Sequence, residues 1–389
     1  MDALLHELVS EDINGVVAGY TTSSATQYLG AHGTKNSQTR EPLTLDTRVA
    51  LFSCTKSMTA MAALKLWEDG RLDLDRPAKE YLPTLGDIGV MENFDMETGE
   101  YTLRRPKTDI TVRHLLLSNS GFAYPFTDPR YAVLGKKTGA NSFSMPLVSD
   151  PGSRWIYGHS MDWAGLVIEA VAGMKLSRFL EQQIFSKAGM TSCTFQVGDP
   201  NKLMPVHIRR DSGLKVMRRQ PLEYKPKTDM GGQGCFATVA DYLRFLRVWL
   251  NYGTSPDTGL RILKRETVEY AIQNHLPPGQ HMEFAAGGEG FKPDGFTMAG
   301  CAYSNNQLPT GRPEGLLYWG GLANLFIWLD FENDVAGIFA CQILPYMDPK
   351  CLVGYLRFEH EVYEAVQRLR EENEDKPLAN GKGIVKLKI

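Results

Sequence analysis

Apolar and polar positions are patterned differently in three parts of the 389-residue chain. Near the N-terminus, short apolar runs at residues 15–20 and 25–29 are separated by a polar turn, which predicts two β-strands. The central part repeats apolar residues at helical spacing. From about Phe296 the pattern changes back to short runs. It predicts three more strands and then a long amphipathic helix, at residues 315–321, 323–330, 336–342 and 351–368.

This distribution predicts the architecture. Strands from both ends of the chain would form one antiparallel sheet flanked by helices, and the mainly helical middle would be inserted as a lobe. The fold class is therefore α/β of the α+β type, in a single domain. We expect a sheet lobe at about residues 1–80 plus 290–370, a helical lobe at about 81–289, and a C-terminal tail at 371–389.

One short stretch joins a predicted strand to a predicted helix. The β-prone run that ends at Phe52 is followed by a helical apolar pattern, for which Gly70 is a plausible stop. Ser53 lies at the start of that helix, and Lys56 lies three residues further on the same face. The free N–H groups and the positive dipole end there favour developing negative charge. A desolvated Lys56 would have a lowered pKa and could accept a proton, which is the chemistry of an activated serine.

The Ser-x-x-Lys motif also has a purely structural explanation. A serine that caps a helix, followed by a surface lysine, gives the same pattern without catalysis. A second copy, Ser212-Gly213-Leu214-Lys215, has glycine in its turn and charged neighbours, and we interpret it as a solvated turn or hairpin. The motif alone therefore leaves Ser53 open between a nucleophile and a cap.

Composition narrows the functional classes. The net charge is −3 and the basic clusters are short, which argues against nucleic acid binding. The six cysteines form no Cys-x-x-Cys and no compact Cys/His spacing, so we expect reduced thiols, no metal site and no cofactor. No apolar run reaches the roughly 18 residues of a membrane span, and the N-terminus lacks a signal-like apolar core. We therefore expect a cytoplasmic protein.

Two further regions carry candidate chemistry. Tyr157 is predicted on the turn just before a helix that Ser160 would cap. Phe122 and Tyr124 follow a helix stop at residues 119–121, and aromatic side chains in such a loop can line a pocket or pack inside the helical lobe. The glycine-rich bend at residues 231–234 fits close packing better than nucleotide binding.

Three stretches together resemble one family. These are Ser53-Cys54-Thr55-Lys56, Tyr157-Gly158-His159 where the family has Tyr-x-Asn, and Trp319-Gly320-Gly321 where β-lactamases have Lys-Thr-Gly. In order and spacing the chain is similar to the serine β-lactamase and penicillin-binding-protein-like family, on its class C-like side. Stretches at 155–158, 162–165, 232–234 and 344–349 resemble its family VIII esterase branch and, more closely, the fungal lovastatin-pathway acyltransferases (transesterases).

The resemblance implies a role for each matched residue. Ser53 would attack an acyl carbonyl, with Lys56 and Tyr157 as a coupled general base. Either a Tyr157 phenolate or a neutral Lys56 amine could take the proton. The backbone N–H groups of Ser53 and Leu322 would form the oxyanion hole. The candidate substrate-binding residues are Trp319, Gly320, Gly321, His159, Tyr124, Phe122, Tyr318 and Tyr346.

Two departures from the family pattern bear on the substrate. Trp319 replaces a cation that β-lactamases and peptidases use to hold a substrate carboxylate, and a neutral indole cannot do this. His159 replaces an asparagine that contacts the β-lactam side-chain amide. It could assist proton transfer or be a hydrogen-bonded structural histidine. Both changes favour a neutral or apolar acyl group.

The expected function is serine-dependent acyl transfer through an acyl-enzyme on Ser53. The enzyme would be an acyltransferase (transesterase) or esterase of secondary metabolism that acts on a natural-product-like ester or thioester. Its partners would be a small-molecule acyl donor and acceptor, and the donor could also be a carrier-protein or coenzyme A thioester. Two alternatives stay open, a hydrolase of the β-lactamase or D-Ala peptidase type and a non-catalytic scaffold on the same fold.

Overall fold

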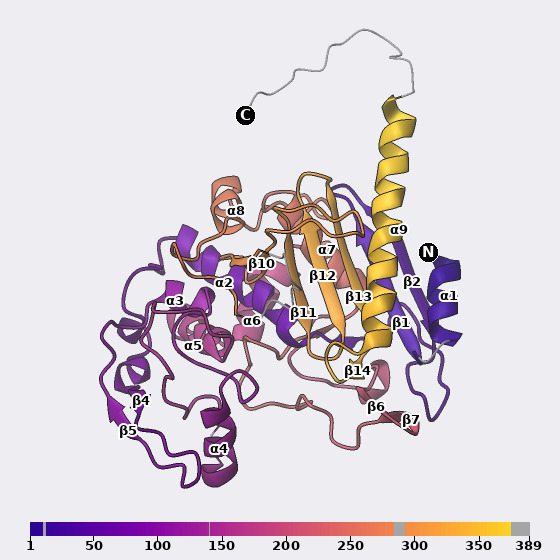
Figure 1. The fold of residues 1–389 in the computed structure, drawn as a ribbon. Coiled ribbons are helices and arrows are strands. Elements are labelled where there is room, and N and C mark those ends of the chain that lie inside the picture. Colours follow the sequence, from indigo (N-terminus) through magenta and orange to yellow (C-terminus); the bar gives the residue numbers. More distant parts are fainter. Residues whose placement is uncertain (11–12, 140, 284–291, 375–389) are drawn as a thin grey trace.

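A seven-stranded antiparallel sheet forms one half of the molecule (Figure 1). The computed structural model describes residues 1–10, 13–139, 141–283 and 292–374. The strand order in the sheet is β2-β1-β13-β12-β11-β10-β9. The bounds are Gly15–Thr21 (β1), Thr26–Gly33 (β2), Gly295–Phe296 (β9), Ala302–Tyr303 (β10), Leu317–Gly321 (β11), Leu325–Asp330 (β12) and Val335–Ala340 (β13). The two ends of the chain therefore share one sheet.

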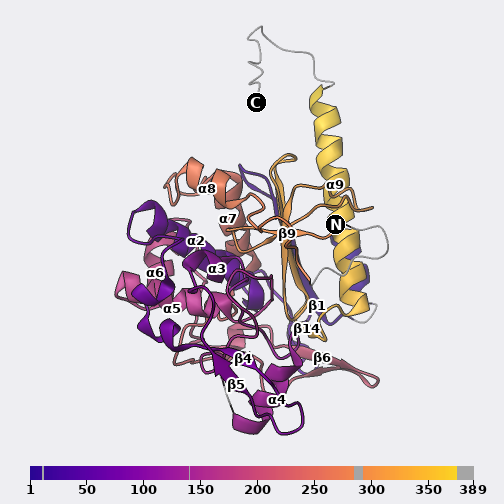
Figure 2. The same ribbon diagram turned by 60° about the vertical axis from the view of Figure 1, so that its left-hand side comes forward.

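Helices cover both faces of this sheet (Figures 1 and 2). One face packs on α1 (Asp2–Ser10) and α9 (Pro349–Glu374), and the other packs on α7 (Val239–Leu250). Successive side chains of a strand point to opposite faces. Ile338 of β13 accordingly lies in the core that includes α7, whereas Phe339 packs 5.9 Å from the ring of Phe358 on α9. The segment that becomes α7 falls in the range expected for the helical lobe, but the structure places it against the sheet.

The helical half is arranged around α2 (Thr55–Glu68). Every residue from Thr55 to Leu64 is buried, so this helix is enclosed on all sides rather than amphipathic. The helices α5 (Ser160–Ala172), α6 (Leu176–Leu180) and α8 (Arg265–Ala271) pack against α2, and α3 (Val112–Leu116) packs on α5. The helix α4 (Pro129–Thr138) and the hairpin of β4 (Val90–Glu92) and β5 (Thr102–Arg104) lie further out in this half (Figure 1). The helix α4 had no counterpart among the predicted elements.

Short strand pairs connect the two halves. The strand β3 (Val49–Ala50) pairs with β8 (Phe236–Ala237), and β14 (Ile343–Leu344) runs parallel to β6 (His207–Arg210). β6 in turn forms a hairpin with β7 (Gly213–Val216), so the second Ser-x-x-Lys copy lies in a hairpin, as predicted. β3 is the end of the strand predicted before Ser53, whereas its two-residue partner β8 carries too little alternation to be recognised from the sequence.

The long helix α9 extends beyond the sheet (Figure 1) and includes residues 371–374 of the predicted tail. The remainder of that tail, and residues 284–289 of the expected helical lobe, lie outside the described residues. None of the helices in the described ranges is long and apolar enough to span a membrane.

Candidate active site

Ser53 lies on a sharp connection between β3 and α2. A single 3₁₀ turn, η1 (Phe52–Cys54), makes this connection, and Phe52 has a φ of +45°, in the left-handed region that non-glycine residues rarely adopt. Such a conformation costs of the order of 1–3 kcal/mol and persists only where the surroundings enforce it. The Leu51 N–H donates to the Cys235 carbonyl at 3.0 Å, which ties the turn to the segment beside β8. The fold therefore holds the Ser53 hydroxyl at the start of a buried helix.

Lys56 lies in the first turn of α2 and is fully buried. Its Nζ donates to Ser53 Oγ at 3.1 Å, to the Gly232 carbonyl at 2.8 Å and to the Tyr124 hydroxyl at 3.3 Å. Burial lowers the pKa of Lys56 to about 8, and the nearby Asp162 carboxylate opposes that shift. The surface-lysine explanation of the motif is therefore wrong, because this amine is enclosed and directed at the serine.

Tyr157 approaches the same hydroxyl from the segment that leads into α5. Its hydroxyl donates to Ser53 Oγ at 2.5 Å, and its ring lies 4.7 Å below the Lys56 ammonium. Burial raises the pKa of Tyr157 well above its usual value, so the neutral phenol is the favoured form. The structure thus brings Ser53, Lys56 and Tyr157 together, although 104 residues separate the serine from the tyrosine.

A buried carboxylate, Asp162, holds the Gly232 loop that hydrogen-bonds to Lys56. Asp162 on α5 is fully buried, and its Oδ1 accepts the Gly232 N–H at 2.8 Å, while the Gly232 carbonyl receives Lys56. A Cβ at position 232 would lie only 2.8 Å from Asp162 Oδ1, which explains the glycine. Neither residue was singled out for a role from the sequence. Both residues do lie in stretches that resemble the family, at 162–165 and 232–234, and this resemblance was the feature of the sequence that could have identified them.

His159 contacts the same carboxylate. Its Nδ1 lies 3.1 Å from Asp162 Oδ2, and its ring packs edge-on to Tyr124 at 4.4 Å between ring centres. His159, rather than Ser160, is the residue that precedes the first turn of α5, so the expected cap was wrong by one position. The position of His159 fits a hydrogen-bonded structural histidine beside the site.

The two aromatic residues of the loop after α3 lie in different surroundings. The Tyr124 hydroxyl reaches Lys56, which places this side chain at the site. Phe122 is fully buried and stacks on Trp163 at 5.5 Å between ring centres. Phe122 therefore packs inside the helical lobe, whereas the Tyr124 hydroxyl faces Lys56.

Strand β11 contributes residues to the site from the sheet, next to Tyr157 and the turn that carries Ser53. Trp319 is almost fully buried, with its ring 5.3 Å from that of Tyr157 in an edge-on arrangement. Gly321 passes so close to η1 that a Cβ there would lie 2.6 Å from the Leu51 carbonyl oxygen. β11 contacts η1, and Leu322, whose side chain is exposed, is the next residue after this close approach. Only glycine permits this close approach of the two segments.

Two other predicted pocket residues lie on the far side of β11. Tyr318 precedes Trp319 and points to the other face, where its hydroxyl donates to Asp294 at 2.5 Å. Tyr346 lies over Gly320, where a Cβ would be 3.1 Å from the tyrosine hydroxyl. The structure therefore does not bring Tyr318 to the serine hydroxyl, and the Tyr346 hydroxyl lies against Gly320 of β11.

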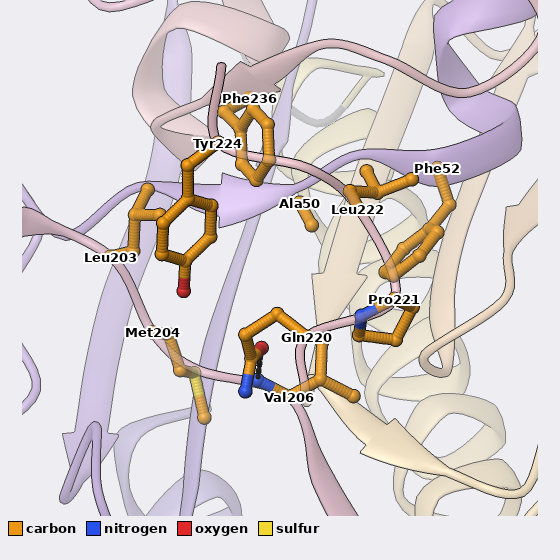
Figure 3. A pocket seen from close by; sticks show the side chains of 10 residues that line it. All are labelled: Ala50, Phe52, Leu203, Met204, Val206, Gln220, Pro221, Leu222, Tyr224 and Phe236. Carbon is orange, nitrogen blue, oxygen red and sulfur yellow. Dashed lines mark hydrogen bonds between the residues drawn. The ribbon is translucent and has the colours of Figure 1, made fainter. Parts of the chain in front are cut away.

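A small apolar cavity lies next to the nucleophile turn (Figure 3). It has a volume of about 10 Å³, which is room for about one water molecule. Its lining residues are Ala50, Phe52, Leu203, Met204, Val206, Gln220, Pro221, Leu222, Tyr224 and Phe236. The cavity is too small for an acyl chain, so it belongs to the packing that holds Phe52.

The region around Ser53 also contains a cysteine, Cys54. Cys54 is buried, and burial raises the pKa of its thiol well above the usual value, so it does not compete with Ser53 as a nucleophile. Across the described ranges of the chain, no group of three or more His, Cys, Asp or Glu side chains is placed to hold a metal ion. The groups that the structure brings together here are a hydroxyl, an amine and a phenol.

Comparison with known proteins decides the family. The family model described as Beta-lactamase matches residues 1–360. The chain belongs to the beta-lactamase family. This confirms the resemblance inferred from the three motifs, together with the β-lactamase/transpeptidase-like fold class.

Within the beta-lactamase family, the chain is similar to named acyl-transfer enzymes. It is 30% identical to monacolin J acid methylbutanoyltransferase of Aspergillus terreus over 355 residues, which cover 84% of each chain. It is 27% identical to lovastatin esterase of Penicillium rubens over 363 residues, covering 83% of this chain and 87% of that protein. A variant of simvastatin synthase from Aspergillus terreus superimposes with a TM-score of 0.84 at 27% identity, covering 94% of both chains. The chain is thus an enzyme of serine-dependent acyl transfer, on the acyltransferase and esterase side of the family.

Proposed function

We propose that Ser53 takes an acyl group from an ester or thioester and passes it to an acceptor alcohol, with Lys56 and Tyr157 handling the proton. The observation that carries this proposal is the enclosure of Ser53 Oγ between the Tyr157 hydroxyl at 2.5 Å and Lys56 Nζ at 3.1 Å. A nucleophile within hydrogen-bond reach of a base that is itself held in place is the arrangement that serine catalysis needs. Here Gly232 and Tyr124 hold the base.

The neutral amine of Lys56 is the better candidate for the proton acceptor. Burial lowers the pKa of Lys56 and raises the pKa of Tyr157, because it disfavours the charged form of each group, the ammonium and the phenolate. A pKa of about 8 leaves about a tenth of Lys56 neutral at pH 7. We therefore assign proton acceptance to the neutral amine of Lys56, which lies 3.1 Å from Ser53 Oγ and can take the serine proton directly, and we assign Tyr157 the role of a neutral hydrogen-bond donor to that oxygen.

The oxyanion of the tetrahedral intermediate would lie between the N–H groups of Ser53 and Leu322. The close approach of Gly321 to Leu51 supports this assignment, because it places the backbone that follows β11 beside the turn that carries the serine. Preorganised donors of this kind contribute about 2.7–4 kcal/mol of transition-state stabilisation each. The Ser53 N–H lies at the start of the helical segment, where backbone donors lack helical partners.

The acyl group is proposed to be short and apolar. The wall next to the serine is aromatic, with Trp319 and Phe296 5.4 Å apart and Trp319 packed on Tyr157. An apolar wall offers no charge to hold a substrate carboxylate. The methylbutanoyl group named for the A. terreus relative fits this description, so a branched C5 acyl group is the first donor to test.

The acceptor is proposed to be an apolar alcohol. Two large apolar side chains are exposed beside the reacting groups: Phe126, which is 62% exposed and stacks on Tyr124, and Leu322, which is 40% exposed. An apolar alcohol that covers these side chains would also exclude water from the acyl-enzyme, which favours transfer over hydrolysis. Both fates of an acyl-enzyme, transfer to an alcohol and hydrolysis, are represented among the relatives, one of which is named a transferase and another an esterase.

The test is intact-protein mass spectrometry after brief mixing with the p-nitrophenyl ester of 2-methylbutanoic acid. Wild type should gain one acyl adduct that Ser53→Ala lacks. Cyclic and linear alcohols are then added, and an apolar alcohol should clear the adduct faster than water does. An adduct that appears equally on Ser53→Ala would overturn the assignment of the nucleophile, and clearance by water alone would make the enzyme an esterase.

A further inference from the structure

Thr127 lies in the short loop between Tyr124 and α4, and its side chain reaches two segments of the chain at once. Its hydroxyl accepts the Tyr124 N–H at 2.9 Å and lies 2.8 Å from the Tyr157 carbonyl oxygen. The Tyr124 carbonyl oxygen is slightly further away, at 3.1 Å, and already receives the N–H groups of Thr127 and Asp128 at 3.0 Å each. A hydroxyl has one proton to donate, so we assign that proton to the Tyr157 carbonyl. Thr127 thus joins the backbones of the two tyrosines.

The two tyrosines contact different members of the proposed reacting group. The Tyr157 hydroxyl donates to Ser53 Oγ at 2.5 Å, and the Tyr124 hydroxyl receives Lys56 Nζ at 3.3 Å. Their rings pack edge-on, with 5.1 Å between ring centres. A shift of either backbone would therefore change the geometry around the serine and the amine together.

The loop that carries Thr127 is itself held by the start of α4. Asp128 is buried, and its Oδ1 accepts the Arg130 N–H at 3.0 Å, which caps this helix. The Arg130 guanidinium binds the same carboxylate through two nitrogen atoms, at 2.9 and 2.6 Å, and donates to the Val148 carbonyl at 3.3 Å. The helix α4, which lies in the outer part of the helical half (Figure 1), therefore gives Thr127 a fixed support.

The hydrogen bond from Thr127 restrains Tyr157 in a way that ring packing does not. The Tyr157 ring lies 6.0 Å from that of Trp155 and 5.3 Å from that of Trp319. Apolar packing is non-directional, whereas a hydrogen bond sets both a distance and an angle. Thr127 therefore adds a directional restraint to the backbone from which the Tyr157 phenol extends.

We propose that Thr127 is a positioning residue for acyl transfer, whose hydroxyl holds the Tyr157 backbone so that the phenol donates to Ser53 Oγ. This inference rests on the proposed function and adds a residue that acts on Ser53 only through Tyr157. A displacement of about 1 Å in a catalytic arrangement can reduce the rate by about 10²-fold. The effect should fall on the rate of Ser53 acylation and not on ester binding, because the restrained hydrogen bond is made to the nucleophile.

The experiment compares two substitutions of Thr127 in the full chain. Thr127→Val removes the hydroxyl with little change of shape, whereas Thr127→Ser keeps it. Single-turnover acylation by the p-nitrophenyl ester of 2-methylbutanoic acid is followed over a range of ester concentrations. Thr127→Val should lower the rate constant at saturation by about 10–100-fold and leave the half-saturating concentration within about twofold of wild type. Thr127→Ser should react at nearly the wild-type rate.

A matched control removes a threonine hydroxyl at the other end of α4. The Thr138 hydroxyl donates to the Leu134 carbonyl of its own helix at 2.8 Å, so Thr138→Val should keep the wild-type values. Thr127→Ala, which also lacks the hydroxyl, replaces Thr127→Val if the valine variant does not fold. Failure of both variants to fold would overturn the proposal, because the hydroxyl would then be a requirement of the fold.

A double-mutant cycle with Tyr157→Phe distinguishes positioning from a general structural role. In the Tyr157→Phe background, Thr127→Val should slow acylation by at most about twofold, because the hydroxyl that Thr127 positions is gone. Intact mass measured over hours follows the slow reaction of this background. An equal loss in both backgrounds would overturn the proposal, as would a wild-type rate for Thr127→Val or an equally slow Thr127→Ser. Absence of acylation in the wild type would instead count against the proposed function.

Discussion

The protonation of Lys56 is the residue-scale property on which the proposed chemistry depends. Within the part of the chain that the structure describes, no carboxylate forms an ion pair with this amine. Its hydrogen-bond partners are a hydroxyl, a phenol and a carbonyl, contributed by Ser53, Tyr124 and Gly232. The charged and titratable groups that act on it are the Asp162 carboxylate, the Cys54 thiol and the two phenols around it. Burial among mostly neutral partners is the reason that its pKa falls.

Activity should therefore rise with pH through about 8. The neutral amine is the active form of the base, so kcat/KM for a p-nitrophenyl ester should climb as Lys56 loses its proton, with an ascending limb near the pKa of about 8. Lys56→Arg cannot lose a proton in this range and should reduce kcat/KM by about 10²–10⁴-fold. Lys65→Arg on the same helix, where the side chain pairs with Glu68 and Asp69, should keep the wild-type profile. A flat profile between pH 6 and about 9 would contradict this assignment.

Asp162 should influence the pH at which kcat/KM rises as Lys56 loses its proton. Its carboxylate raises the pKa of Lys56 against the effect of burial, and it also holds the loop whose carbonyl receives the amine. Asp162→Asn keeps an oxygen that can accept the Gly232 N–H but removes the charge. The Lys56 limb in the pH profile of kcat/KM should then move to lower pH. An unchanged limb would show that Asp162 has only a structural role.

The elements meet at positions where only glycine fits. Gly158 lies between Tyr157 and His159, and a Cβ there would be 2.2 Å from the Phe122 carbonyl oxygen and 2.5 Å from the Ala123 Cα. Both contacts are with backbone, which cannot move aside as a flexible side chain would. The approach of α5 to the loop after α3 thus depends on the missing side chain, and this approach is what carries Tyr157 to the serine.

Gly158→Ala should destabilise the protein by about 1–3 kcal/mol, because the added methyl group forces the two segments apart. It should also slow acylation of Ser53, since Tyr157 moves with the segment. The measurements are the urea midpoint of unfolding and the acylation rate. Gly198→Ala is the control, because a Cβ at position 198 meets nothing within 4 Å. Equal midpoints for the two variants would count against the close contact.

At the scale of the whole molecule, the sheet separates a catalytic side from a supporting side. The core between the sheet and α2, α5 and α7 adjoins Ser53, Lys56 and Tyr157, the proposed reacting groups, whereas α1 and α9 cover the other face with a second core. Phe358 of α9 is fully buried in that second core, within ring-packing distance of Tyr28, Trp328 and Phe339. Substitutions in the second core should therefore lower the free energy of unfolding without changing the rate of Ser53 acylation.

Phe358→Ala should lower the free energy of unfolding by about 3–5 kcal/mol, because it removes a large buried ring from a packed core. Ser53 acylation measured well below the melting temperature should stay within about twofold of wild type, since the sheet lies between. Val353→Ala on the same helix, at a side chain that is 52% exposed, should change stability by at most about 0.5 kcal/mol. Thermal unfolding of both variants tests this. A large loss of acylation in folded Phe358→Ala would contradict the separation of the two sides.

The sequence by itself determined the local features of this protein. Period-two and period-3.6 apolar patterns gave the long strands and helices, because backbone geometry dictates which neighbours in sequence share a face. The same rule put Ser53 beside Lys56, three residues apart on one helix face. The order of the three motifs then indicated the family, which the match over residues 1–360 confirmed.

Only the tertiary structure decided which distant residues meet. It placed Tyr157 on Ser53, put the Gly232 carbonyl on Lys56, and laid the α7 segment against the sheet. It also separated Tyr124, which reaches the amine, from Phe122, two residues earlier, which stacks in the core. No periodic pattern distinguishes such cases, because long-range contacts depend on how whole elements pack and on where a missing Cβ lets two backbones approach. The lowered pKa of Lys56 was likewise decided by the tertiary structure, because burial is a property of the assembled fold.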